Sequence, residues 1–469
     1  MKRRDLLIGM GAFAMSRVRG RAAAPVDIQL EVDVTRGMGN IPADFTGLGY
    51  EISSVARKGL LDPSNTKYIQ LVKTLSKNGV IRIGGNTSDF SAWEPHGEAS
   101  ILPKATVTNT ALVEALGGFL RATGWKLIWG LNLGRGTAES AADQAAAVAR
   151  AAGDRLLCFE IGNEPDLFVG QGHKPKGYGY AEYRQEFERF AEALRARVPG
   201  ARLAGPDVAG ATDWVASFAH DERDRISLLT EHYYRTGQKN PLATMENLLN
   251  TDERFVKMTA RLQEIGKSSG LPYRLCELNS FSGGGKPRIS DTFASALWGL
   301  DLMFTLASAG GAGINFETGL NHLGFVSSYS PIYEDEAGNL TARPLYYGML
   351  AFATAGTGRL VEARSSASGG NFRSYATVDT SGRLCFTLIN KDVATAVNAS
   401  IKVPAPASSV EVLRLSAPAI NSMTGVTFGG TEVSANGIWA PHRQPVVRVR
   451  GGMLKLEVPA ASASIVRVT

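Results

Sequence analysis

The sequence predicts an α/β fold: a (β/α)8 barrel of the TIM type with an additional antiparallel β-sandwich formed mainly by the C-terminal segment. Two observations predict this architecture. Short apolar runs alternate with helical stretches eight times over about 310 residues, which is typical of parallel strands that close into a barrel. After residue 356 the pattern changes to short alternating runs broken by Gly, Ser, Asn and Pro, which is typical of an antiparallel sandwich. A chain of 469 residues has room for both domains.

The barrel is predicted over residues 41–356. Its strands are expected where short apolar runs end in polar residues, and its helices where the longer segments between them show a helical pattern. The eight strand-like runs are 44–51, 80–85, 126–132, 156–164, 201–208, 227–234, 273–280 and 312–319. The clearest helical stretches are 138–152, 180–198, 253–265 and 292–308.

The sandwich is predicted over residues 357–469. A further alternating run at 26–34 precedes the barrel, and we expect residues 25–40 to form a strand that pairs with the C-terminal strands. The strand-like runs of the C-terminal segment are 371–379, 384–390, 409–415, 446–449 and 463–468.

Residues 1–24 have the layout of a signal peptide. Adjacent arginines, Arg3 and Arg4, precede a weakly apolar run at 6–15, and further basic residues and three alanines follow. This pattern predicts a twin-arginine signal and an exported protein, periplasmic or secreted. A Sec leader and an uncleaved anchor are the alternatives, and Pro25 is unfavourable directly after a cut at Ala24. No other stretch of 18 or more uncharged apolar residues exists, so no membrane span is expected.

The charge balance argues against a nucleic-acid partner. The formal net charge is +6, but residues 1–24 hold six basic residues and one acidic residue. The rest of the chain therefore has 44 basic and 43 acidic residues, a net charge of only +1. A protein that tracks a polyanion along its whole surface is not predicted, although a local basic patch remains compatible with this balance. No nucleic-acid-binding motif is present.

The cysteines and histidines predict neither a disulfide framework nor a metal centre. Cys158, Cys276 and Cys385 are odd in number and widely separated, so we expect buried free thiols. The six histidines show no metal-ligand spacing. No metal and no cofactor are predicted.

Glutamates end two of the predicted strands. In a (β/α)8 barrel the active site lies at the carboxyl ends of the strands. The fourth run ends in Gly-Asn163-Glu164-Pro, and the seventh contains Glu277; Glu51 ends the first run. Two carboxyl groups facing each other at a barrel mouth can serve as acid/base and nucleophile in glycosidic bond cleavage. On barrel geometry alone, surface or salt-bridged glutamates are an equal alternative.

Four motifs carry a resemblance to a known family. Gly-Asn-Glu164-Pro, followed 113 residues later by Glu277, is similar to the clan A glycoside hydrolases. The segments 82–90 (RIGGNTSDF), 232–234 (HYY) and 277–285 (ELNSFSGGG), taken with it, resemble glycoside hydrolase family 79, the β-glucuronidases and heparanases. The resemblance covers essentially the whole chain after the leader, including the flanking sandwich.

The resemblance implies a role for each catalytic residue. Glu164 would be the acid/base and Glu277 the nucleophile of a retaining mechanism, which requires carboxyl groups about 5 to 5.5 Å apart. Asn163 would contact the 2-hydroxyl of the sugar. Tyr234 would donate to Glu277 and keep it oriented and ionised. His232 is the one histidine at a predicted strand end, where we expect a supporting role rather than catalysis.

The resemblance also implies contacts to the sugar and to its carboxylate. Gly283 and Gly284 would offer backbone N–H groups as an anion nest, unless the glycine run is only a flexible loop. Tyr329 would complete the carboxylate contact, with Tyr333 as the rival. The sugar hydroxyls would be bound by Glu51 and Asn86.

The predicted activity is that of a retaining exo-β-glucuronidase acting on a glucuronic-acid-containing carbohydrate. The alternative is an endo-β-glucuronidase of the heparanase type acting on heparan sulfate, which would differ in the loops after the second and sixth strands. A remote alternative is a non-catalytic glycan-binding protein. The oligomeric state is not predicted.

Overall fold

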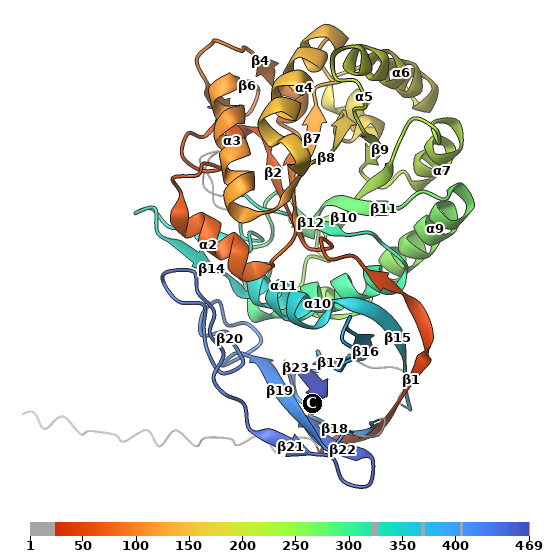
Figure 1. The fold of residues 1–469 in the computed structure, drawn as a ribbon, viewed down its shortest axis with the longest axis vertical. Coiled ribbons are helices and arrows are strands. Elements are labelled where there is room, and N and C mark those ends of the chain that lie inside the picture. Colours follow the sequence, from red (N-terminus) through yellow and green to blue (C-terminus); the bar gives the residue numbers. More distant parts are fainter. Residues whose placement is uncertain (1–23, 320–326, 367–370, 404–406, 469) are drawn as a thin grey trace, which may run out of the picture.

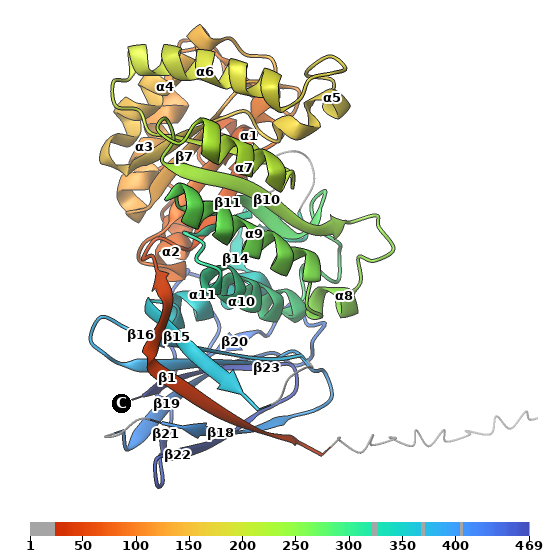
Figure 2. The same ribbon diagram turned by 90° about the vertical axis from the view of Figure 1, so that its right-hand side faces the viewer.

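The computed structural model describes residues 24–319, 327–366, 371–403 and 407–468. The strands between residues 47 and 317 include those of a closed barrel, and a β-sheet domain lies beneath the barrel in both views (Figures 1 and 2). The predicted fold class is confirmed. The predicted signal peptide lies almost entirely outside the described residues, since these begin at residue 24. No helix in the described ranges is long and apolar enough to cross a membrane.

All eight predicted barrel strands are present, and they follow one another around the barrel in chain order. Every neighbouring pair is parallel, and the last strand closes the barrel against the first. Almost all of their residues are buried, because a parallel barrel covers both faces of each strand. The strands are β2 (Gly47–Glu51), β3 (Val80–Gly84), β7 (Lys126–Leu131), β8 (Leu156–Ile161), β9 (Leu203–Val208), β10 (Leu228–Gly237), β11 (Tyr273–Ser282) and β12 (Ile314–Glu317).

Helices surround the barrel, and their ends follow local capping rules. Thr137 caps the fourth helix by accepting from the Ser140 amide, and Gly270, in a left-handed conformation, ends the ninth. The longer helices are α2 (Thr66–Leu75), α3 (Thr110–Thr123), α4 (Ala138–Ala152), α6 (Tyr180–Arg197), α7 (Thr212–Asp221), α9 (Glu253–Ser269), α10 (Phe293–Ser308) and α11 (Pro344–Ala355). Shorter helices are α1 (Ile52–Ala56), α5 (Phe168–Gln171) and α8 (Met245–Leu249).

Two small sheets form within the loops that connect the barrel strands and helices. The loop after β3 folds into a three-stranded sheet, and the segment before α11 forms a two-stranded antiparallel hairpin. Their strands are β4 (Ala92–Trp93), β5 (Ser100–Leu102), β6 (Ala105–Thr108), β13 (Ile332–Glu334) and β14 (Leu340–Ala342).

The C-terminal domain is a ten-stranded sheet around its own apolar core. The N-terminal strand β1 (Val26–Ile41) belongs to this sheet, where it is antiparallel to β15 and parallel to β18. Figure 2 shows β1 crossing beside β15 before the chain enters the barrel. The other strands are β15 (Gly358–Ser365), β16 (Phe372–Val378), β17 (Leu384–Asn390), β18 (Val397–Lys402), β19 (Ser409–Ser416), β20 (Thr427–Phe428), β21 (Val446–Arg448), β22 (Met453–Val458) and β23 (Ser462–Val468).

Helix α10 joins the two domains. Fourteen of its sixteen residues are buried, so it has no polar face of the kind a surface helix shows. It packs against α11 and also contacts β1 and β17 of the sheet domain. Helix α10 is apolar on all its faces because it lies between the barrel and the sheet (Figure 1).

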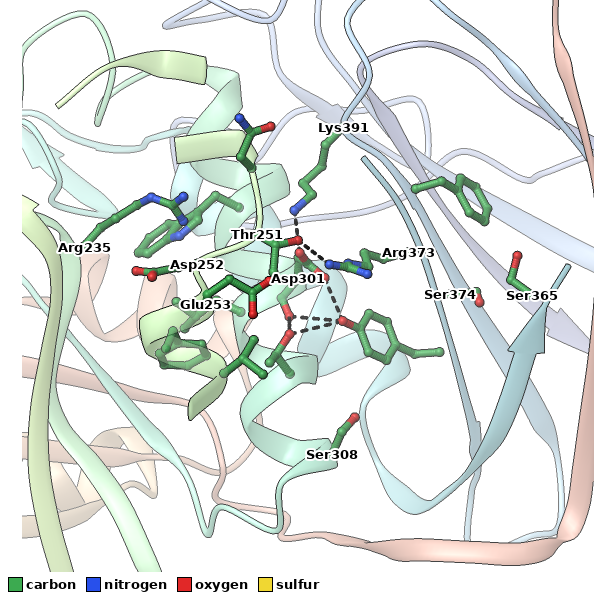
Figure 3. Close-up of a pocket in the computed structure, with 18 of the residues that line it drawn as sticks. Arg235, Thr251, Asp252, Glu253, Asp301, Ser308, Ser365, Arg373, Ser374 and Lys391 are labelled. Carbon is green, nitrogen blue, oxygen red and sulfur yellow. Dashed lines mark hydrogen bonds and ion pairs between the residues drawn. The ribbon is translucent and has the colours of Figure 1, made fainter. Parts of the chain in front are cut away.

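A buried ion pair crosses the domain junction. Lys391, directly after β17, lies with its Nζ 2.6 Å from Oδ2 of Asp301 on α10, and the Tyr375 hydroxyl donates to Oδ1 of Asp301 at 2.7 Å. Figure 3 shows this group in the wall of a cavity of about 520 Å³ between the two domains. The ion pair fixes the sheet domain against the barrel helix.

Replacing Lys391 by Met is expected to lower the free energy of unfolding by about 3 to 5 kcal/mol, because it leaves the buried Asp301 carboxylate without its cation. Urea unfolding measures the change. Arg383→Ala is the matched control, since Arg383 pairs with Asp379 but is 74% exposed. The control is expected to cost less than about 1 kcal/mol. Equal, small losses in both variants would show that the junction pair contributes nothing.

Candidate active site

Glu164 and Glu277 meet at the carboxyl ends of the barrel strands. Glu164 follows β8, and Glu277 lies in β11. One oxygen of each carboxyl group and one ring nitrogen of His232 lie within 4.8 Å of one another. Both glutamates are almost enclosed, with 8% and 5% of their surface exposed. The structure thus brings together the two carboxyl groups that the sequence singles out.

A turn in the left-handed region aims Glu164 into the barrel mouth. Glu164 has φ 54° and ψ 52°, which is uncommon for a residue with a Cβ, and Pro165 begins a short 3-10 helix directly after it. The Glu164 amide donates to the carbonyl oxygen of Asp207 at 2.9 Å, which anchors the turn to the end of β9. Backbone strain of this kind occurs at functional sites where the surroundings hold it in place.

His232 connects Glu164 to Asp207. Its Nδ1 lies 3.0 Å from Oε1 of Glu164, and its Nε2 lies 2.9 Å from Oδ1 of Asp207. Burial opposes protonation of the ring, but the charges of Asp207 and Glu277 raise the pKa of His232 well above its usual value. Burial raises the pKa of Glu164, the hydrogen bond and charge of His232 oppose that rise, and the Glu277 carboxylate adds to it. A raised pKa is what a general acid needs near neutral pH.

Arg82 lies beneath the two glutamates and organises the acidic groups. Its guanidinium group is fully buried and donates to Glu160 at 3.0 Å, Glu277 at 2.8 Å and Asn163 at 2.8 Å, and it also pairs with Asp207. Burial raises the pKa of Asp207, but Arg82 and His232 outweigh it and lower that pKa to about 2. Asp207 is therefore a fixed negative charge beside the two cations.

Glu277 receives two hydrogen bonds that fix its orientation. Tyr234 donates its hydroxyl to Oε1 at 2.9 Å, and Arg82 donates to Oε2 at 2.8 Å. This arrangement suits a carboxylate that must act as a nucleophile.

The three residues predicted to bind sugar hydroxyls lie at or just after the carboxyl ends of β2, β3 and β8. Glu51 accepts from the amide and hydroxyl of Thr87, and burial, followed by the charge of Glu277, raises its pKa to about 7. The Asn163 side chain accepts from Arg82, and its Nδ2 lies 3.5 Å from Oδ1 of Asn86. Asn86 is exposed and also accepts from Gln171 at 3.2 Å.

The glycine run lies directly after β11, on the chain that carries Glu277. Gly283 and Gly284 have φ values of 82° and 94°, which residues with a Cβ rarely adopt. Among the described residues, neither of their N–H groups has a hydrogen-bond acceptor. The carbonyl oxygen of Gly284 accepts from the Tyr329 amide, which brings that tyrosine to the run.

The structure separates the two candidate tyrosines. Tyr329 is buried, with its ring centroid 6.3 Å from that of Tyr234, and burial, together with the charges of Glu317 and Glu277, raises its pKa well above the usual value. Tyr333 instead packs against the Arg343 guanidinium group at 4.1 Å and lines a separate cavity. Tyr329 therefore lies beside the site glutamates, and Tyr333 does not.

Sequence reasoning gave no role to four buried polar residues of the site. Asp89 accepts from the amides of Leu133, Gly134 and Asn163, and so ties the ends of three strands together. Burial raises its pKa to about 7 against these hydrogen bonds. Asp207 and Glu317 lie near the ends of predicted strands, and this position was the signal by which they could have been found. Arg82 and Asp89 lie in the RIGGNTSDF segment, which was recognised only as a motif.

The donor sets that could hold a metal ion already contact cations. The described residues contain two such groups, Glu160–Asp207–Cys276 and Glu164–His232–Glu277. Arg82 bonds to members of both groups, and the second contains His232 itself. A metal ion would have to compete with these positive charges.

Cys158, Cys276 and Cys385 are free thiols, although Cys385 is only half-buried rather than buried as predicted.

Comparison with known proteins identifies relatives of both domains. Residues 371–465 match the model of the glycosyl hydrolase family 79 C-terminal beta domain. A β-glucuronidase of Aspergillus niger is 28% identical over 306 residues, covering 57% of this chain and 55% of that protein. A β-glucuronidase of Neurospora crassa is 26% identical over 375 residues (70% and 66%), and mouse heparanase is 23% identical over 361 (64% and 66%). The matches thus span somewhat over half the length of these curated relatives.

Solved structures share the fold over nearly the whole chain. A 4-O-α-L-rhamnosyl-β-D-glucuronidase from Fusarium oxysporum superposes with a TM-score of 0.77 at 17% identity, covering 94% of this chain and all of that one. A family 51 α-L-arabinofuranosidase from Bifidobacterium longum gives a TM-score of 0.72 at 14% identity, covering 94% and 99%. The C-terminal domain matches the family 79 model, and the chain is related in sequence to curated β-glucuronidases and heparanases, which agrees with the resemblance to glycoside hydrolase family 79 that its motifs carry.

Proposed function

We propose that this protein is a retaining β-glucuronidase that removes terminal β-D-glucuronic acid from glucuronides. The observation that carries the proposal is the pair Glu164 and Glu277, whose nearest carboxyl oxygens lie within 4.8 Å. This closeness suits retention, because an inverting enzyme needs a wider gap that admits a water molecule between sugar and base. The curated relatives named β-glucuronidase support the substrate class.

The mechanism assigns opposite protonation states to the two glutamates. Glu277, oriented by hydrogen bonds from Tyr234 and Arg82, attacks the anomeric carbon as a carboxylate while Glu164 gives its proton to the departing oxygen. The glycosidic bond breaks as the bond between Glu277 and the sugar forms. Glu164, now a carboxylate, then takes a proton from water, which displaces Glu277 and leaves glucuronic acid in its original anomeric configuration.

The uronate carboxylate needs donors, and the glycine run supplies them in this proposal. The N–H groups of Gly283 and Gly284 have no acceptor among the described residues, and the Tyr329 backbone bonds to the same run. Consecutive amides in a left-handed turn form an anion nest. Hydrogen bonds to a charged carboxylate are stronger than those to a neutral hydroxyl, so this corner would favour a glucuronide over a glucoside.

Hydrolysis of p-nitrophenyl β-D-glucuronide tests the proposal, with the matching β-D-glucoside and α-L-arabinofuranoside as controls. We expect kcat/KM for the glucuronide to exceed that for either neutral sugar by at least about 100-fold, the equivalent of one or two charge-assisted hydrogen bonds. Hydrolysis of the neutral sugars alone would contradict the uronate assignment.

The position of cleavage on a polymer is tested separately. Similarity to mouse heparanase keeps an endo-acting enzyme as the second candidate. Incubation with heparan sulfate followed by sizing distinguishes the two: the exo activity releases free uronic acid, whereas an endo activity shortens the chains.

The signal-like pattern of residues 1–24 supports action outside the cytoplasm, and we include export in the proposal.

A further inference from the structure

Glu317 is a buried carboxyl group for which the proposed mechanism has no use. It ends β12 and is only 3% exposed. Its partner in the neighbouring strand is Gly49 of β2, and a Cβ at that position would lie 2.8 Å from Oε2 of Glu317. The glycine therefore leaves room for the Glu317 side chain inside the barrel mouth.

One oxygen of Glu317 is unsatisfied. Its Oε2 is buried and has no hydrogen-bond partner among the residues that the structure describes. The nearby guanidinium group of Arg82 is committed to Glu160, Glu277, Asn163 and Asp207. A buried polar oxygen without a partner is costly, and at a functional site a bound ligand is one way to satisfy it.

The charged groups around Glu317 come from several strands. Glu51 and Tyr50 lie near it on β2, Tyr234 on β10, Glu277 on β11, and Tyr329 in the segment after β12. The cations are Arg82 on β3 and His232 on β10, and both already bond to other carboxylates. Burial first, and then the charges of Glu277 and Glu51, raise the pKa of Glu317 well above its usual range. A raised pKa favours the neutral carboxylic acid, which has one O–H group to donate.

Glu317 also lies beside the residues to which the uronate is assigned. The Asn279 side chain donates from Nδ2 to the carbonyl oxygen of Glu317 at 3.0 Å and to that of Tyr329 at 3.3 Å. Of the charges that raise the pKa of the buried Tyr329 phenol, that of Glu317 comes first. The Tyr329 amide in turn bonds to Gly284 of the glycine run. The corner thus holds a phenol, two backbone N–H groups without an acceptor among the described residues, and a carboxyl group with a raised pKa.

We propose that Glu317 determines specificity for uronates by donating a hydrogen bond from its protonated carboxyl group to the carboxylate of the substrate. This inference rests on the proposed function and adds the residue that discriminates the acidic sugar. An O–H···O⁻ hydrogen bond is short and strong, so the neutral acid attracts a uronate. Once ionised, the same group repels it. Recognition of the uronate is therefore present below the raised pKa of Glu317 and is lost as the pH rises through it.

The test compares wild type with Glu317→Gln and Glu317→Leu. The readout is the ratio of kcat/KM for p-nitrophenyl β-D-glucuronide to that for the glucoside, from pH 5 to pH 10. Gln keeps a donor and cannot ionise, so we expect its ratio to stay constant within about twofold while the wild-type ratio falls at high pH. Leu has no donor, so its ratio is expected to be lower than wild type by about tenfold or more at low pH.

Glu51→Gln is the matched control, because Glu51 is a neighbouring carboxyl group assigned to sugar hydroxyls. It is expected to weaken both substrates and to keep the fall of the ratio, displaced to lower pH because the charge of Glu51 helps to raise the pKa of Glu317. The same pH course in wild type and Glu317→Gln would overturn the inference, as would a fall that disappears only in Glu51→Gln.

A binding measurement distinguishes failure of the inference from failure of the proposed function. D-glucuronate is expected to raise the unfolding temperature of wild type and of Glu317→Gln, and to raise that of Glu317→Leu much less. If wild type turns over the glucuronide but wild type and both Glu317 variants bind D-glucuronate alike, only the inference is wrong. If wild type neither hydrolyses the glucuronide nor binds D-glucuronate, the proposed function is wrong and this inference with it.

Discussion

Replacing Glu277 by Ala is expected to lower kcat on p-nitrophenyl β-D-glucuronide by about 10⁴-fold or more, because the variant has no group that can attack the anomeric carbon. The loss should be in kcat rather than in KM, since Glu277 is assigned to the bond-forming step. Steady-state kinetics measure it. Glu264→Ala, which removes a 69% exposed carboxyl group on α9, is expected to leave kcat within about twofold of wild type.

The variant must be shown to fold, because Glu277 also accepts from the buried Arg82. Glu277→Gln keeps an oxygen for that hydrogen bond and is expected to be as inactive as the alanine variant, with a smaller loss of stability. Azide should restore turnover of Glu277→Ala by occupying the space left by the side chain and forming the α-glucuronyl azide. Substantial residual activity in Glu277→Gln would refute its role as the nucleophile. Release of the α-anomer by wild type, detected by NMR, would refute retention.

The barrel was predictable because its signal is local and repeated. Each strand is a short apolar run between polar segments, and eight such runs fix the architecture even though single boundaries shift. Helix α9 shows the limit. It continues to Ser269 and is ended by Gly270, whereas the predicted helix ends at residue 265. The prediction stops early because the last turn is polar. A polar last turn carries no apolar period that a sequence pattern could detect.

The candidate site was predictable where a residue stood in a motif at a strand end. Glu164, Glu277 and Tyr234 satisfied that condition, and the structure brings them together. Arg82 did not receive a role, because a single cation within an apolar strand does not show from the sequence which carboxylates it will meet. Its partners are brought to it only when the barrel closes. Its four partners come from three strands and the turn after one of them.

The role proposed for Glu317 could not be predicted from the sequence either. Its environment depends on Gly49 being its strand partner and on Glu51 and Glu277 pointing into the same space. These are distances between residues far apart in the chain, and no spacing along the sequence encodes them. The protonation state that follows from them could be inferred only after folding had placed the groups.

Replacing Glu164 by Ala is expected to lower activity in proportion to how much the leaving group needs a proton. For phenyl β-D-glucuronide, whose leaving group is poor, kcat/KM should fall by about 10² to 10⁴-fold. For 2,4-dinitrophenyl β-D-glucuronide, which leaves without protonation, the first step should be nearly unaffected, and the glucuronyl enzyme should accumulate because no base activates water. Azide should then speed turnover of this substrate and give the β-glucuronyl azide, the configuration opposite to that from Glu277→Ala.

The pH dependence distinguishes the acid/base role from a structural one. Burial raises the pKa of Glu164, so its protonated form persists to higher pH than that of an exposed glutamate. The first step requires that form, and kcat/KM of wild type for phenyl β-D-glucuronide should fall as the pH rises through the raised pKa. In Glu164→Ala this alkaline limb should disappear while the remaining activity stays level. A variant that loses activity equally on both substrates and keeps the alkaline limb would show that Glu164 only supports the site and that another group supplies the proton.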